Sequence, residues 1–89
     1  MSLLLERYLE IKASVPNTVL FVGLGDFYET FETDAETVAM ITGRPLVDAN
    51  GKTMCGVHSL FFDGVLQQMA EAGYSVSVCE DFPEGRRSC

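Results

Sequence analysis

An aromatic residue and a carboxylate two positions apart, Phe27 and Glu29, are the pair in this chain best suited to chemistry. They follow the apolar residues 19–22 and the turn-forming pair Gly25 and Asp26. An aromatic ring can wedge between base steps of a kinked duplex, while a polar group beside it hydrogen-bonds an exposed base. The spacing therefore suits a reader of distorted DNA, presented at a strand-to-helix junction.

A structural interpretation accounts for the same residues. Phe27 begins an apolar stripe with Phe31 and Ala35, which is the spacing of one helical face. Asp26 and Glu29 are three positions apart, as in a capping pair in the first turn of that helix. On this pattern alone the structural interpretation is favoured, because motifs of this length recur by chance.

Four segments give the pair a wider context, and they occur in a fixed order: Tyr8 to Lys12, Gly25 to Phe31 with Asp34 and Ala35, Met54 to Val57, and Ala72 to Glu80. Together they resemble the N-terminal mismatch-recognition domain of the MutS family. In that family the matching Phe stacks on a mispaired base, and the matching Glu bonds that base in the minor groove. The resemblance implies these roles for Phe27 and Glu29, with Gly25 and Asp26 shaping the turn that presents them.

The chain departs from the family pattern where the family holds the DNA backbone. Gly23 replaces a usual Arg, residues 46–51 are acidic where the family is basic, and His58-Ser59-Leu60 replaces a Pro-Tyr-His pattern. The family's histidine is therefore not carried over. The net charge of −7 also repels phosphates. The alternative function is an acidic protein-interaction or adaptor module that keeps the fold without DNA binding.

No catalytic or cofactor-binding pattern accompanies the pair, so the sequence predicts a non-enzyme without cofactors. Residues 22–25 lack the third glycine of a dinucleotide fingerprint, and the chain lacks a phosphate-loop motif. Three cysteines without C-x-x-C spacing and one histidine, His58, predict no metal site. The carboxylates from Asp26 to Glu36 are expected to form a solvated face of one helix rather than a metal cluster.

Hydrophobic periodicity predicts an α+β (mixed α/β) fold in the order α-β-α-β-β-α-β, a small mixed sheet covered by helices. Helices are expected at residues 2–14, 26–42 and 59–72, with Ser2 as an N-cap. Thr33 and Glu36 offer a later capping box as an alternative start of the second helix. Strands are expected at residues 18–24, 45–47, 53–57 and 74–80, with a tight hairpin at Asn50-Gly51. The last strand should lie beside the first. The later helices should pack on the sheet through Phe31, Val38, Val65, Leu66 and Met69.

Composition predicts one small domain, residues 1–82, followed by a flexible polar tail, residues 83–89. An apolar content of 47% is ample for a core. No apolar run approaches the roughly 20 residues of a membrane span, so no membrane partner is expected. The first residues lack a basic leader, which favours a cytoplasmic location. The expected partners are mismatched or distorted double-stranded DNA and other domains of a MutS-like or mobile-element protein.

Overall fold

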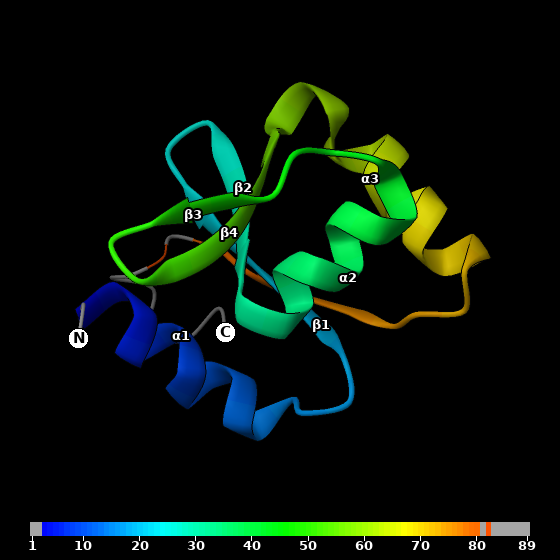
Figure 1. Ribbon diagram of the computed structural model, residues 1–89. Helices are drawn as coiled ribbons and strands as arrows, with labels where there is room; N and C mark the ends of the chain where they lie inside the picture. Colours follow the sequence, from blue (N-terminus) through cyan, green and yellow to red (C-terminus); the bar gives the residue numbers. More distant parts are fainter. Residues whose placement is uncertain (1–2, 81, 83–89) are drawn as a thin grey trace.

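One mixed sheet with helices on both faces forms the domain (Figure 1). The computed structural model describes residues 3–80 and residue 82, and within them five strands have the order β3-β4-β2-β1-β5. The elements are α1 (Leu3–Ser14), β1 (Val19–Leu24), β2 (Phe27–Phe31), α2 (Glu32–Thr42), β3 (Val47–Ala49), β4 (Lys52–His58), the 3₁₀ helix η1 (Ser59–Phe61), α3 (Phe62–Glu71) and β5 (Val76–Cys79). The predicted α+β class is confirmed. The expected cap Ser2 and the expected tail at residues 83–89 lie outside the described residues.

Strand pairing confirms two of the expectations. The last strand, β5, runs parallel to β1, with Val19 opposite Val76. Strands β3 and β4 form the predicted hairpin, and Asn50 and Gly51 at its turn have φ values of 53° and 73°. A type I′ turn needs positive φ at both central residues, which the Asn-Gly sequence tolerates. None of the described helices is both long enough and apolar enough to cross a membrane.

The second helix begins later than predicted. Residues 27–31 form β2, which pairs with β1 on one side and β4 on the other, and α2 begins at Glu32. Gly25 and Asp26 are the two loop residues of the β1–β2 hairpin. Gly25 has a φ of 60°, and glycine at the first loop position is typical of a type II′ turn. The predicted strand-to-helix junction and the helical stripe beginning at Phe27 are therefore wrong.

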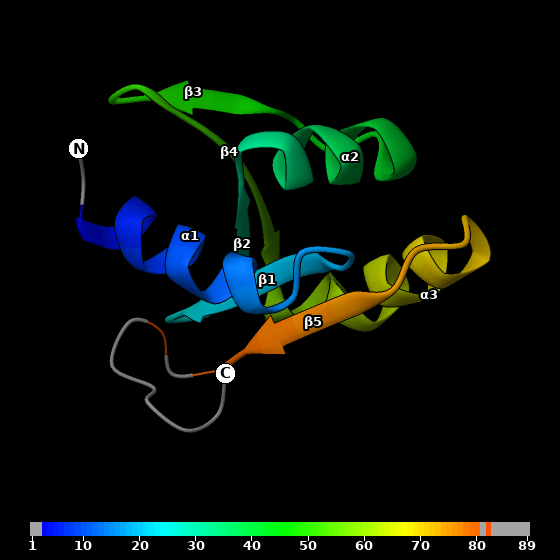
Figure 2. The same ribbon diagram turned by 90° about the horizontal axis from the view of Figure 1, so that it is seen from below.

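The sheet separates two clusters of buried side chains. Helices α2 and α3 cover one face, and α1 covers part of the other (Figure 2). Val38, Val65 and Met69 are buried in the first cluster as predicted, but Leu66 is only partly buried. Phe31 belongs to the second cluster, beneath α1, because it lies on β2 rather than on a helix.

A buried polar network joins α1 and α2 to β1. Asp34 accepts a hydrogen bond from the Leu20 N–H at 3.0 Å, and Lys12 Nζ lies 2.9 Å from Asp34 Oδ2. The Tyr8 hydroxyl lies 2.7 Å from the Leu20 carbonyl oxygen and 3.0 Å from Asp34 Oδ2. Burial, and then the Asp34 charge, raise the pKa of Tyr8 well above its usual value. The predicted solvated acidic face is therefore wrong for Asp34, which is 7% exposed and holds the helices in place.

Candidate nucleic-acid interface

Phe27 and Glu29 lie on the same face of β2, since alternate residues of a strand point to the same side. This is the face that α1 covers in part. Phe31, farther along the strand, is buried there against the Tyr8 ring, with 4.9 Å between ring centroids. Phe27, at the hairpin end, is 45% exposed. The sheet face is therefore closed at Phe31 and open at Phe27.

Contacts on both faces and both edges of β2 hold the strand that carries Phe27. Tyr28 points to the opposite face, where its ring stacks on Phe62 with 3.8 Å between centroids and 9° between planes. Phe27 itself pairs with Leu24 across one side of β2 and with His58 across the other. Its ring meets the His58 ring edge-on, with centroids 5.1 Å apart and planes at 80°. The exposed ring thus stands on a strand whose backbone is held on both sides.

Glu29 is half-buried because its carboxylate lies over Gly56, its cross-strand partner on β4. A Cβ atom at Gly56 would stand 2.7 Å from Glu29 Oε2 and 2.9 Å from Oε1. No side chain fits there while the carboxylate keeps this position. Burial raises the pKa of Glu29, and neither ion pair found within the described residues includes it. The half-buried position therefore disfavours the charged carboxylate relative to that of an exposed glutamate.

A hollow of about 270 Å³ opens beside Phe27 and Glu29, toward the β3–β4 hairpin. The remaining residues that line it are Pro45, Val47, Met54 and Gly56. Typical small-molecule sites have volumes of roughly 300–1,000 Å³. The hollow is below that range, so it suits a single ring better than a cofactor. Within residues 3–80 and 82, no three His, Cys, Asp or Glu side chains are grouped as metal ligands.

The four predicted site residues come together at one end of the sheet. Gly25 and Asp26 form the turn, and Phe27 and Glu29 follow on β2. Sequence reasoning missed one neighbour, His58, which it weighed only as a metal ligand and as a departure from the family pattern. His58 ends β4 and contacts Phe27 because of the β2–β4 register. No local signal relates two residues that are 31 positions apart, although the Phe27–His58 pairing follows once the strands are aligned.

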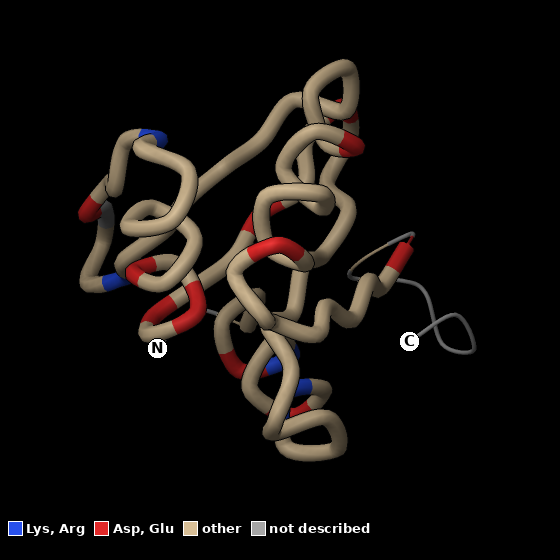
Figure 3. Tube along the Cα trace, turned by 90° about the vertical axis from the view of Figure 1, so that its right-hand side faces the viewer, with Lys and Arg blue, Asp and Glu red and all other residues tan. Residues whose placement is uncertain are grey.

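Acidic residues outnumber basic residues in this chain, 13 to 6. Figure 3 shows acidic residues spread over several segments, with few basic residues among them. Arg7 pairs with Glu10 at 3.2 Å, and Lys12 pairs with Asp34. Among the residues described, Arg44 and Lys52 are therefore the basic side chains outside an ion pair. Asp26 adjoins Phe27 in the turn, but the neighbours of the ring across the sheet are Leu24 and His58. Glu29 also lies near the ring, since both side chains line the same hollow.

Comparison with known proteins identifies the family of the chain. The chain matches the family model described as MutS domain I over residues 3–87. It is 41% identical over 90 residues to the DNA mismatch repair protein MutS of Lawsonia intracellularis, covering 96% of this chain and 10% of the relative. The MutS of Desulfitobacterium hafniense is 42% identical over 82 residues, covering 86% of this chain and 10% of the relative. That of Thermotoga neapolitana is 35% identical over 88 residues, covering 99% and 11%.

The chain belongs to the MutS domain I family. It spans about a tenth of the length of these relatives. Each of the relatives is named as a DNA mismatch repair protein.

Proposed function

We propose that this domain reads mismatched or otherwise distorted double-stranded DNA as a non-catalytic part of a larger MutS-type protein. The observation that carries the proposal is the placement of Phe27 and Glu29 on one open face of the sheet. Family membership and the names of the relatives support DNA as the partner. A DNA ligand also favours the bacterial cytoplasm as the location.

Phe27 is proposed as the wedge. Unstacking a base step costs a few kcal/mol, and stacking on an aromatic ring returns about 1–3 kcal/mol per base. The ring must therefore lose little freedom on binding. Pairing of β2 on both sides and the edge contact with His58 support such a preorganised ring.

Glu29 is proposed as the base contact. The minor groove presents hydrogen-bond acceptors at adenine N3 and thymine O2. A carboxyl with a raised pKa is protonated more readily and can donate to such an acceptor. Gly25 and Asp26 support both roles, since their tight turn leaves room for DNA to approach Phe27 closely.

The isolated domain should bind weakly. Its net charge of −7 opposes the phosphate contacts that supply nonspecific affinity. Other domains of a MutS-type protein would then supply the remaining grip on the duplex. The same charge favours the alternative function, an acidic adaptor module that binds basic protein partners.

Fluorescence anisotropy at low salt, with one mismatched and one matched duplex, tests the proposal. We expect the parent to prefer the mismatched duplex, and Phe27→Ala to remove that preference while the thermal midpoint stays nearly unchanged. Phe27→Leu should behave like Phe27→Ala, because leucine fills space without offering a face for stacking.

Tyr74→Ala is the matched control. Tyr74 is 42% exposed and precedes β5, at the end of the sheet away from Phe27, so its loss should leave the preference intact. A parent without mismatch preference at millimolar protein would favour the adaptor function. Unfolding of Phe27→Ala would identify Phe27 as a core residue.

A further inference from the structure

We propose that the DNA-contacting surface continues from Phe27 across His58 to Phe61 and Arg44, and that Arg44 binds a phosphate of the strand beside the wedge. This inference rests on the proposed function and extends it from base reading to backbone contact. We call the three rings of Phe27, His58 and Phe61 the aromatic ridge.

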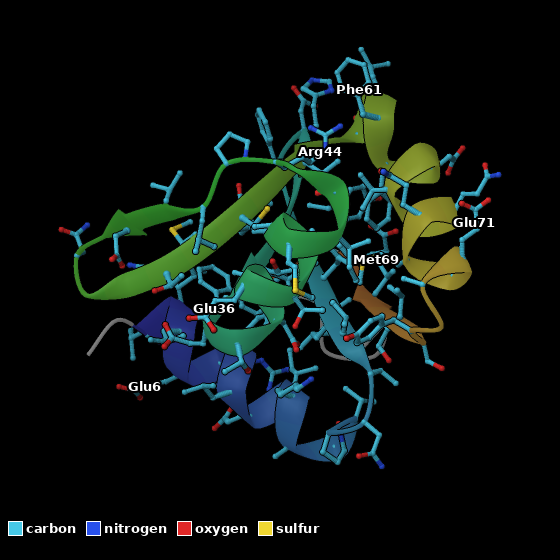
Figure 4. The ribbon with its side chains drawn as sticks, turned by 45° about the vertical axis from the view of Figure 1, so that its right-hand side comes forward. Glu6, Glu36, Arg44, Phe61, Met69 and Glu71 are labelled. Carbon is cyan, nitrogen blue, oxygen red and sulfur yellow. The ribbon has the colours of Figure 1, made fainter. Side chains whose placement is uncertain are left out.

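The ridge is a continuous series of side-chain contacts. The Phe27 and His58 rings are 5.1 Å apart, and the His58 and Phe61 rings are 6.5 Å apart. The guanidinium carbon of Arg44 lies 5.6 Å from the centre of the Phe61 ring. Figure 4 shows Arg44 and Phe61 together at one end of the molecule, with Glu6 of α1 at the opposite end. A cation therefore lies at the end of a row of rings that begins at the proposed wedge.

Backbone contacts tie the far end of the ridge to the wedge. The Ser59 N–H donates to the Asp26 carbonyl oxygen at 2.8 Å, which joins η1 to the β1–β2 turn. The Leu60 N–H donates to His58 Nδ1 at 3.1 Å. These two bonds place η1 relative to Phe27, so the ridge is positioned before any ligand arrives. Phe61 in η1 nevertheless remains 57% exposed.

The same contact determines which nitrogen of His58 can donate. Because Nδ1 accepts the Leu60 N–H, the neutral imidazole carries its proton on Nε2. His58 is only half-buried, so that donor lies between the two exposed rings of the ridge. Phosphate and sugar oxygens accept hydrogen bonds from donors of this kind. His58 therefore adds a polar contact between the wedge and Arg44.

Charge complementarity identifies the occupant as the sugar-phosphate backbone of the bound duplex. Arg7 and Lys12 are held in ion pairs with Glu10 and Asp34, so they are less available to phosphates. Arg44 instead lies over an aromatic face and forms no ion pair within the described part of the chain. A stacked guanidinium keeps its planar set of N–H donors in one orientation, which suits phosphate binding.

Anisotropy titrations over a series of salt concentrations test the phosphate contact. Neutralising one phosphate of duplex DNA contributes about 0.9 to the slope of log affinity against log salt. We expect Arg44→Gln to reduce that slope by about one phosphate and to weaken binding of both duplexes on the order of tenfold. The mismatch preference should remain. Phe61→Ala should also weaken both duplexes, because the guanidinium loses its stacking surface.

Arg7→Gln is the matched control, since it removes the same charge from a different element, α1. Its salt slope should equal that of the parent. NMR provides a second measurement, in which the Leu60 and Phe61 amide signals should shift when mismatched duplex is added. Thermal midpoints of all variants should match the parent, because the altered side chains are partly or largely exposed.

The outcomes separate this inference from the proposed function. If Arg44→Gln and Arg7→Gln have equal salt slopes while Phe27→Ala removes the mismatch preference, the phosphate contact is overturned. The proposed base reading then remains intact. A reduced slope for Arg44→Gln with a preference that survives in Phe27→Ala would support the phosphate contact and reject the wedge. A parent that binds neither duplex at low salt would overturn both, as would ridge amides that respond only to a protein partner.

Discussion

Replacing Gly56 with alanine should detach the Glu29 carboxylate from the sheet without unfolding the domain. The added Cβ would stand 2.7 Å and 2.9 Å from the two carboxylate oxygens, closer than nonbonded atoms tolerate. These oxygens are the far end of a flexible side chain, so Glu29 can rotate away. The carboxylate then enters water, and its pKa should fall toward the ordinary value of 4.5.

The stability change worked from these contacts is small. Alanine in place of a strand glycine gains about 0.5–1 kcal/mol in backbone entropy. An unfavourable rotamer of Glu29 costs about 0.5–1.5 kcal/mol. The free energy of unfolding should therefore change by no more than about 1 kcal/mol. The proposed base contact, however, should be lost, so the mismatch preference should fall.

Three measurements check this reasoning: a pH titration of the Glu29 carboxyl carbon by NMR, urea denaturation, and binding to matched and mismatched duplexes. Gly64→Ala is the control, because a Cβ at Gly64 on α3 would meet nothing within 4 Å. It should stabilise the domain by up to about 1 kcal/mol and leave Glu29 unchanged. A Glu29 pKa that stays raised in Gly56→Ala, or a loss of several kcal/mol, would refute the close-approach argument.

Three further predictions concern the network, the pH dependence and the core. Asp34→Ala should lower the free energy of unfolding by about 3–5 kcal/mol in urea denaturation, because Lys12 would lose its buried partner. Glu29 binds its proton more tightly in the folded state than in the unfolded state, because its folded-state pKa is raised. The free energy of unfolding therefore falls as pH rises through that raised pKa. Glu29→Gln should therefore raise the thermal midpoint at pH 7 and change little below about pH 4, near the usual glutamate pKa. Met69→Ala should cost about 2–5 kcal/mol and Leu66→Ala clearly less, since Met69 is fully buried and Leu66 only partly. Equal losses for the two would contradict the assigned burial.

Local sequence determined those elements whose signals are short in range. The Asn50-Gly51 turn followed from the backbone preferences of two adjacent residues. Helices α1 and α3 were predicted from apolar positions at intervals of three and four. The structure differs from that prediction at the start of α3, where residues 59–61 form a separate 3₁₀ helix. The pairing of β5 with β1 was also predicted correctly. The Phe-x-Glu pair was recognisable because residue types and their spacing can be read directly from the sequence.

The tertiary structure determined that residues 27–31 form a strand and not a helix. Phe27 and Phe31 are four positions apart, and this interval places two side chains on one side of a helix and equally on one side of a strand. Pairing with β1 and β4 settled the choice, since it satisfies the backbone of β2 on both edges. The β2–β4 pairing also places Phe27 beside His58.

Burial of charged groups was likewise decided by packing between distant segments. Asp34 and Glu29 are both carboxylates in an acidic stretch, and nothing local distinguishes them. Asp34 is enclosed because α1 brings Tyr8 and Lys12 over it, whereas Glu29 is enclosed because β4 presents a glycine opposite it. The sequence by itself determined which chemical groups the domain carries. The crossing of its helices and the register of its strands determined which of those groups lie in water and which lie together.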